Sequence, residues 1–268
     1  MEEVAEKIFG SNESQEIKQS IVSRMKHYEV CMDPNHHKST KEEIKQLLDQ
    51  KNIITALDKL TPLPCCKETM GLTTLRNENV YDGVFRSNWI NHYCCWHLPP
   101  TLPQLHELVQ FIGNTNDNNI VLEVGAGKGI LAALLQSCDV NVVATDVMGE
   151  DKFYGAGHFI KPEHEDIGVG FSYVPIEKLT VSQALEKYGA KSKVLMSCWG
   201  NYNIREDDLQ HFTGNKAIII GEQNGCTGCG HLQNICEEGK EGWQHVKTIK
   251  IPIFNSLHDE CYLYERIK

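Results

Sequence analysis

Short apolar runs alternate with amphipathic segments over most of the chain. Five runs have the composition of buried strands: Ile120 to Val124, Val140 to Ala144, Tyr173 to Ile176, Lys193 to Trp199 and Lys216 to Glu222. Apolar residues at helical spacing lie between these runs and before the first, where a helix is expected to begin near Pro103. Strands that alternate with helices predict an α/β fold with a parallel sheet. Two closing segments with alternating polarity, 246–253 and 261–267, add an antiparallel hairpin and make seven strands.

In the first 64 residues a polar stretch, residues 1–15, is followed by segments with apolar residues at helical spacing. Thr40-x-x-Glu43 matches a capping box, which predicts a helix start at Thr40, and Met32 to Ser39 is expected to form a turn. Thr61-Pro62-Leu63-Pro64 ends the last helix of this part. We therefore expect an N-terminal helical extension, residues 1–64, and an α/β domain, residues 65–268. The extension either pads the domain or forms a lid or partner surface, and padding is the simpler interpretation.

A glycine-rich turn follows the first buried run. Gly125, Gly127 and Gly129 stand at alternate positions, where they allow positive φ and leave no Cβ to hold a ligand away from the backbone. A helical pattern begins at Ile130, so the turn joins a strand to a helix N-terminus. Asp146 stands at the carboxyl end of the next strand. A strand, a glycine turn, a helix and a second strand that ends in a carboxylate are typical of half of a nucleotide-binding unit. In such a unit the carboxylate accepts hydrogen bonds from both ribose hydroxyls.

The glycine spacing and Glu123 indicate which nucleotide is bound. The dinucleotide fingerprint is G-x-G-x-x-G, whereas here the third glycine comes one residue earlier and Glu123 precedes the first. This E-x-G-x-G-x-G pattern resembles motif I of the class I S-adenosylmethionine (SAM) methyltransferases. SAM has no phosphate but carries a sulfonium and an amino group, so the carboxylate of Glu123 suits it and would repel a pyrophosphate.

The resemblance implies a fold and a cofactor site. The fold would be a Rossmann-like seven-stranded methyltransferase sheet with helices on both faces, preceded by the helical extension. The cofactor would be SAM, and an NAD-dependent oxidoreductase is disfavoured by the glycine spacing. The residues expected to contact SAM at the first two strands are Glu123, Gly125, Ala126, Gly127, Gly129 and Asp146.

Further motifs resemble a family of methyltransferase-like proteins over about residues 90–268. The matching stretches are Trp96-x-x-Pro99, Trp199-Gly200-Asn201, Ile220 to Gly228 (which includes Gly-Cys-Thr-Gly) and His258-Asp259. The family has two prolines where this sequence has Gly200 and Asn201. That departure weakens any analogy with amine methyltransferases, whose D/N-P-P-Y tip binds the target nitrogen.

The carboxyl ends of strands predict the rest of the site, because open α/β sheets bind ligands there. Cys198 and Trp199, at the tip of the fourth strand, are expected to face the cofactor. Trp96, before the first strand, either closes over SAM or packs the extension onto the sheet. Four residues are candidates for the catalytic role: Asn201 and Tyr202 as hydrogen-bonding positioners, and Glu222 and His258 as bases.

The cysteines offer one alternative chemistry. Cys226, Cys229, His231 and Cys236 have the composition of a zinc site. The family usually carries Asp where Cys229 stands, so loop geometry is the preferred interpretation and no metal is predicted. Eleven cysteines without an N-terminal export signal are typical of reduced thiols in the cytoplasm or nucleus.

Charge and hydropathy restrict the partners. A net charge of -10 disfavours binding to nucleic acid over a broad face, and no apolar run approaches the roughly 20 residues of a membrane span. The sequence therefore predicts a SAM-dependent methyltransferase that acts on a small-molecule or protein acceptor. The alternative is a catalytically inactive protein of the SAM-binding fold that serves as an interaction module.

Overall fold

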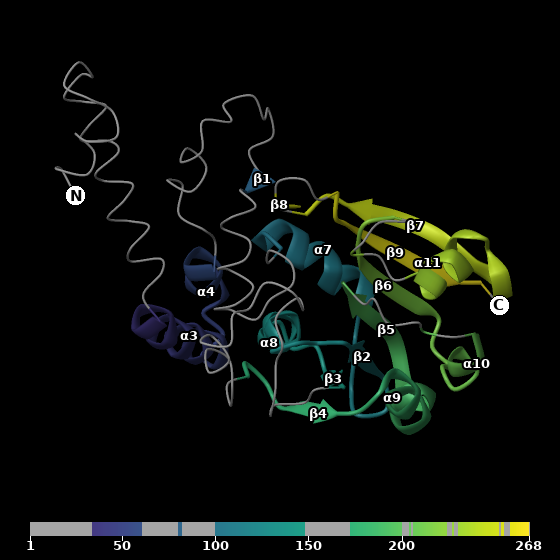
Figure 1. The fold of residues 1–268 in the computed structure, drawn as a ribbon, viewed down its shortest axis with the longest axis horizontal. Helices are drawn as coiled ribbons and strands as arrows, with labels where there is room; N and C mark the ends of the chain where they lie inside the picture. Colours follow the sequence, from purple (N-terminus) through teal and green to yellow (C-terminus); the bar gives the residue numbers. More distant parts are fainter. Residues whose placement is uncertain are drawn as a thin grey trace, which may run out of the picture.

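A seven-stranded sheet forms the centre of the computed structural model (Figure 1), which describes residues 34–60, 80–81, 100–147, 172–199, 204, 206–223, 227, 230–251, 253–254 and 258–267. Its strand order is β4-β3-β2-β5-β6-β9-β7. The strands are β2 (Ile120–Val124), β3 (Val142–Asp146), β4 (Ile176–Lys178), β5 (Ser192–Cys198), β6 (Lys216–Gly221), β7 (Trp243–Ile249) and β9 (Glu260–Arg266). The first five are parallel, and β9 lies antiparallel between β6 and β7. The predicted Rossmann-like seven-stranded methyltransferase fold is confirmed.

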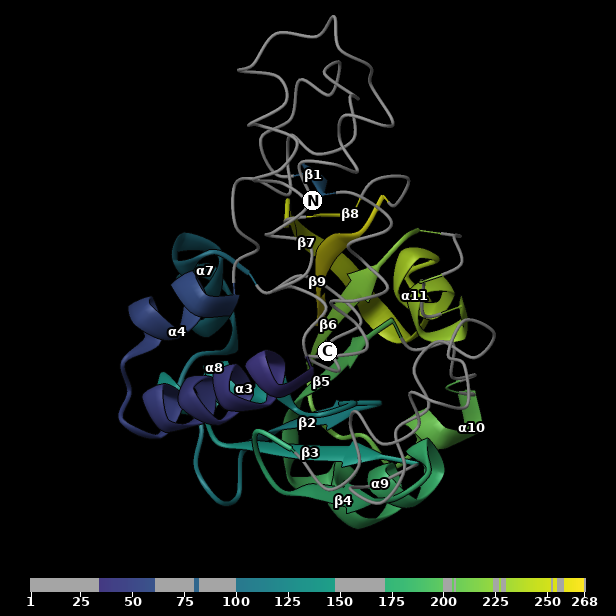
Figure 2. The same ribbon diagram turned by 60° about the vertical axis from the view of Figure 1, so that its left-hand side comes forward.

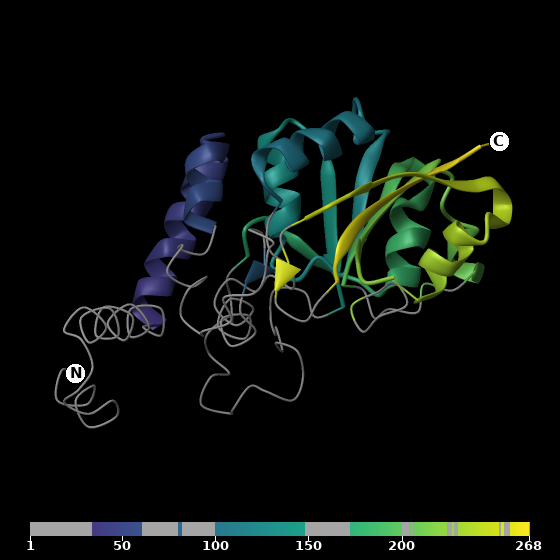
Figure 3. The ribbon, with the colours of Figure 1, turned by 90° about the horizontal axis from the view of Figure 1, so that it is seen from above.

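Helices cover both faces of this sheet (Figure 3). One face carries α3 (Pro34–Asp49), α4 (Ile53–Leu60), α7 (Leu102–Ile112) and α8 (Ile130–Ser137). The other carries α9 (Val181–Tyr188), α10 (Glu206–Leu209) and α11 (Gly230–Glu237). Two short 3-10 helices, η2 (Gly189–Lys191) and η3 (Lys240–Gly242), precede β5 and β7. A separate two-stranded sheet is formed by β1 (Val80–Tyr81) and β8 (Ile253–Phe254). Among the described helices, none has the length and apolar character needed to cross a membrane.

Successive side chains of a strand point to opposite faces of the sheet, so the apolar core has two parts, one on each face. Every residue of β2 is buried. Val121 belongs to the core that β2 shares with α7 and α8, whereas Leu122 and Val124 belong to the core shared with α9 and α11. This double burial is the reason that the parallel strands appear in the sequence as continuous apolar runs.

The described helices of the predicted extension contribute to the core on the α8 face. Ile44 and Leu48 of α3 are buried in the same cluster as α7 and α8, and α3 lies beside α8 (Figure 2). Ser137 Oγ also donates a hydrogen bond of 3.0 Å to the carbonyl oxygen of Leu48. These contacts support the padding interpretation. The boundary at residue 64 stays a prediction, because residues 61–79 lie outside the described part.

The predicted start of this helix at Thr40 is wrong. α3 begins at Pro34, so Thr40 and Glu43 lie within the helix, and residues 34–39 are helical instead of forming a turn. A proline in the first turn loses no helical hydrogen bond, because the N–H groups of that turn have no partner within the helix. The helix therefore extends toward the N-terminus past the capping-box motif.

Gly129 provides a test of how the turn after β2 packs. Its φ of 73° is left-handed, and a Cβ built there would lie 2.6 Å from Val174 Cγ2 and 2.7 Å from Ile176 Cδ1. Gly129→Ala should lower the free energy of unfolding by roughly 2–4 kcal/mol, the sum of left-handed strain and overpacking. Gly239→Ala is the matched control, because Gly239 has φ 65° but its nearest neighbour atom would be 3.5 Å away. The control should cost only about 1–2 kcal/mol. Equal losses in urea denaturation would contradict this account.

Candidate functional site

The glycine turn adopts the backbone conformation that its sequence predicts. Gly125, Gly127 and Gly129 have φ values of 71°, 57° and 73°. Asp146, the last residue of β3, is buried and accepts a hydrogen bond of 3.0 Å from the N–H of Gly127 at Oδ2. Ala126 N–H donates to the carbonyl oxygen of Thr145 at 3.0 Å. The turn is therefore fastened to the carboxyl end of β3, with the Asp146 carboxylate against its backbone.

The strand order reverses beside this turn. From β2 the chain continues outward to β3 and β4, and then returns to place β5 and β6 on the other side of β2. Val124 pairs with Thr145 of β3 and with Ser197 of β5. The next residue on each of these strands is Gly125, Asp146 or Cys198, so the three lie at one edge of the sheet. Ligand sites of open α/β sheets lie at such a switch point.

Glu123 brings an acidic group into this edge. Its side chain is 2% exposed, and its Oε2 has no hydrogen-bond partner among the described residues. Burial, and secondarily the charge of Asp146, raise the pKa of Glu123 to about 8, against a hydrogen bond with the Ala132 backbone that lowers it. A cation placed beside Glu123 would stabilise its charged form. The residues therefore fit a ligand such as SAM, which has cationic groups for Glu123 and ribose hydroxyls for Asp146.

A second group of polar residues lies at the carboxyl ends of β5 and β6. Trp199 Nε1 donates to Asp259 Oδ2 at 2.8 Å, and Thr227 Oγ1 donates to Asp259 Oδ1 at 2.6 Å. Thr227 Oγ1 in turn accepts a hydrogen bond of 2.9 Å from Glu222 N–H. Glu222 Oε1 accepts one of 2.9 Å from the backbone N–H of His258. Three stretches that are distant in the sequence are thus joined into one buried network.

Trp199 occupies an uncommon backbone conformation within this network. Its φ is 49°, which is rare for a bulky side chain, and its backbone N–H donates to the carbonyl oxygen of Ile220. Such strain persists only where surrounding contacts fix it, and it is frequent at functional sites. The bonds to Asp259 and Ile220 therefore hold the tip of β5 in a defined orientation.

The predicted site residues fall into three groups. Glu123, the glycine turn, Asp146, Cys198, Trp199 and Glu222 lie along the same carboxyl edge of the sheet. His258 is exposed, and only its backbone N–H bonds to Glu222. Trp96, Asn201 and Tyr202 lie outside the described residues. The catalytic roles assigned to Asn201, Tyr202, Glu222 and His258 stay predictions.

Three buried polar residues were missed by the sequence-based assignment of roles. Thr227 and Asp259 stand next to Cys226 and His258 in the motifs that carry the family resemblance, but the sequence does not show which residue of each pair is buried. Lys128 is 1% exposed within the glycine turn, and its carbonyl oxygen accepts a hydrogen bond of 2.9 Å from Tyr173 N–H. The sequence signal for this residue was its place between Gly127 and Gly129.

One of the four possible zinc residues has its side chain in the described part of the chain. Cys236 is buried in the apolar cluster around α11. Cys226 and Cys229 lie outside the described residues. Within the described ranges, no three His, Cys, Asp or Glu side chains are placed to hold a metal ion.

Comparisons with known proteins give structural likenesses only. No protein-family model matches the sequence, and no curated protein is significantly similar to it. The magnesium protoporphyrin IX methyltransferase from Synechocystis PCC 6803, solved with bound SAM, aligns with a TM-score of 0.39 and 11% identity over 69% of this chain and 85% of that one. A structure concerned with the conversion of a disulfide bond into a thioacetal group during echinomycin biosynthesis aligns with a TM-score of 0.35 and 16% identity, over 69% and 91%. A mutant of MtNAS aligns with a TM-score of 0.37 and 13% identity, over 87% of each chain.

The hydrogen bonds of Asp259 predict that substitutions of Asp259 and Trp199 have coupled effects on the free energy of unfolding. Asp259→Ala leaves the buried Trp199 Nε1–H and Thr227 Oγ1 without this acceptor, and should lower the free energy of unfolding by about 2–4 kcal/mol. Trp199→Phe removes the donor of the same hydrogen bond, Nε1–H. If the bond is as described, the double variant should lose less than the sum of the single losses, as measured by urea denaturation. Strict additivity would contradict the coupling.

The raised pKa of Glu123 predicts a pH-dependent stability. The folded protein keeps this proton between about pH 4.5 and 8, where the unfolded chain has released it, so stability falls as the pH rises through that window. Glu123→Gln removes this dependence. The free energy of unfolding of the wild type minus that of the variant should decrease by roughly 3–5 kcal/mol between pH 5 and pH 9. Glu186→Gln, on the exposed face of α9, controls for loss of one carboxylate. A difference that is constant with pH would contradict burial of an ionisable Glu123.

Proposed function

We propose that this chain is a SAM-dependent methyltransferase that transfers a methyl group to a small-molecule or protein acceptor. The observation that carries the proposal is Glu123, a buried carboxyl group at the glycine turn with an oxygen that has no partner among the described residues. A buried acid in an otherwise apolar strand is costly unless a ligand compensates it. A cationic nucleoside supplies that compensation, whereas the pyrophosphate of a dinucleotide would add further negative charge.

Each part of the edge has a role in binding this cofactor. When bound, SAM supplies a methyl group on positively charged sulfur. Glu123 stabilises the cationic part of the ligand, and the left-handed glycines let it approach the backbone. The Asp146 carboxylate accepts hydrogen bonds from the ribose hydroxyls. The hydrogen bond that Gly127 N–H donates to Asp146 Oδ2 keeps the carboxylate in place for this contact. These contacts hold the cofactor in a fixed orientation, which is the main requirement of an in-line displacement.

The acceptor would bind beside the tip of β5. The Trp199–Asp259 bond orients this tip, so that Cys198 and Trp199 border the cofactor. We assign Trp96 to closure of the site, Asn201 and Tyr202 to positioning of the acceptor, and Glu222 or His258 to removal of its proton. The net charge of -10 favours a small molecule or a protein over nucleic acid as the acceptor.

Calorimetric titration with SAM, S-adenosylhomocysteine and NAD tests the cofactor assignment. Micromolar binding of the two sulfur nucleosides and none of NAD is expected. Asp146→Asn should weaken nucleoside binding by about 1–3 kcal/mol, because the amide keeps an acceptor for Gly127 N–H but loses an acceptor for the ribose. Asp139→Asn is the matched control, since Asp139 is exposed and its φ of 63° tolerates asparagine.

Proton release provides a second readout of the same binding. SAM should displace a proton from Glu123 near pH 7, so the observed heat should depend on the ionisation enthalpy of the buffer, and Glu123→Gln should abolish that dependence. Binding of NAD alone, or of none of the three ligands, would refute the proposal. SAM binding without methyl transfer from labelled SAM to any component of a cell extract would instead favour an inactive SAM-binding interaction module.

A further inference from the structure

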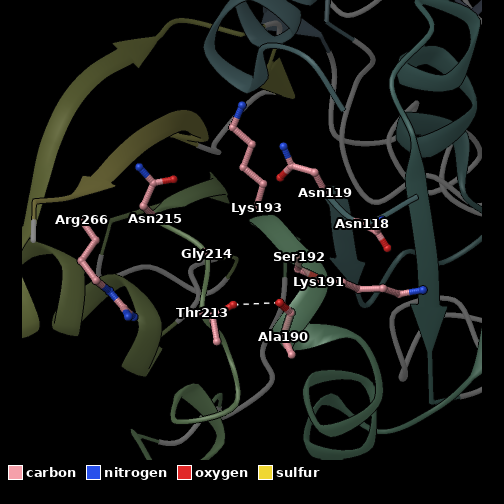
Figure 4. A pocket seen from close by; sticks show the side chains of 10 residues that line it. All are labelled: Asn118, Asn119, Ala190, Lys191, Ser192, Lys193, Thr213, Gly214, Asn215 and Arg266. Atoms are coloured by element: carbon pink, nitrogen blue, oxygen red, sulfur yellow. Dashed lines mark hydrogen bonds between the residues drawn. The ribbon is translucent and has the colours of Figure 1, made fainter. Parts of the chain in front are cut away.

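A polar basin of about 570 Å³ lies at the opposite edge of the sheet (Figure 4). Asn119 directly precedes β2, Ser192 begins β5, and Asn215 directly precedes β6. The basin therefore lies at the amino ends of the central strands, whereas the glycine turn lies at their carboxyl ends. A strand of five to seven residues spans roughly 16–23 Å, so the basin is separate from the candidate cofactor site.

The basin is cationic in an acidic chain. Lys191, Lys193 and Arg266 are among its ten lining residues, and those ten include no carboxylate. In Figure 4, Arg266 and Lys191 lie on opposite sides of the basin and Lys193 lies above both. The amine of Lys193 points up and that of Lys191 points to the right, away from the middle. Glu265 borders the basin, and its Oε1 accepts a hydrogen bond of 3.3 Å from Asn215 Nδ2. A concentration of positive charge in a protein of net charge -10 selects anionic ligands locally.

Parts of the basin have a fixed geometry. The Arg266 guanidinium lies 4.6 Å from the centroid of the Trp243 ring, which stacks with Phe212 at 6.4 Å. Such a cation–π contact holds the charged group against the core. Gly214 packs so closely on β5 that a Cβ would lie 2.4 Å from the carbonyl oxygen of Ser192. Thr213 Oγ1 also donates to the carbonyl oxygen of Ala190 at 2.9 Å, which fixes the loop at the base of the basin.

We propose that this basin binds a small ligand that carries two or more phosphate groups. Guanidinium, ammonium and carboxamide groups are the side chains that proteins use to hold phosphate oxygens, and Asn119 and Asn215 add amide donors to the three cations. The volume falls within the roughly 300–1,000 Å³ of small-molecule sites. The proposal does not depend on methyltransferase activity, because the basin shares no residue with the glycine-turn edge.

Inorganic pyrophosphate is the probe that tests this site, because it has no nucleoside to bind beside Asp146. Calorimetric titration of the full chain at low ionic strength should give saturable binding, which S-adenosylhomocysteine should not compete away. Lys191→Gln/Lys193→Gln should weaken binding at least tenfold, and higher salt should weaken it in the wild type. Lys240→Gln/Lys247→Gln removes the same charge from two exposed lysines elsewhere and should leave affinity unchanged.

Parallel titrations distinguish the possible ligands. Binding of ATP or pyrophosphate that exceeds that of orthophosphate by tenfold or more supports a site for several phosphates. The proposal is overturned by non-saturable binding of pyrophosphate, by an equal loss in both double variants, or by competition with S-adenosylhomocysteine. It is also overturned if a single-stranded oligonucleotide binds through Lys191 and Lys193 while the small phosphates do not. Unchanged circular dichroism of both variants confirms that the fold is retained.

Discussion

Burial of the central strands on both faces is the constraint on which the rest of the structure depends. Because helices cover β2, β5 and β6 from both sides, side chains at successive positions enter two separate apolar cores. Among the described residues, apolar side chains fill both faces of these strands. Both the candidate cofactor site and the cationic basin lie where strands end, as ligand sites of open α/β sheets do.

Glu123 is the exception to this burial pattern. Alternation directs its side chain to the same face of the sheet as Val121, and its neighbours there are apolar or acidic. Violations of a local rule are expected where function requires them. The cost of a buried acid also links the site to the fold, because a cation that binds the folded chain would stabilise it in proportion to its concentration and affinity. Occupancy of the site and resistance to unfolding would then rise together.

The sequence predicts the sheet and the glycine-turn half of the site, because both depend on local patterns. Continuous apolar runs identified the parallel strands, although the second was expected at Val140 and begins at Val142, where it pairs with Val121. The third begins at Ile176, since Tyr173 instead bonds to the glycine turn. The Trp199–Asp259 bond joins residues 60 positions apart, and the basin joins the starts of three strands. No local pattern encodes either, because both arise only from tertiary pairing.

The position of β9 has a consequence for how the chain folds during synthesis. β7 pairs in the sheet only with β9, which follows it in the sequence, and β9 also completes the edge of β6. Until residues 260–266 leave the ribosome, β6 exposes an open edge and β7 has no native partner in this sheet. An open edge is a template for pairing with other chains. The seven-stranded sheet therefore closes only after β9 has been synthesised, and until then the open edge of β6 favours association with other chains.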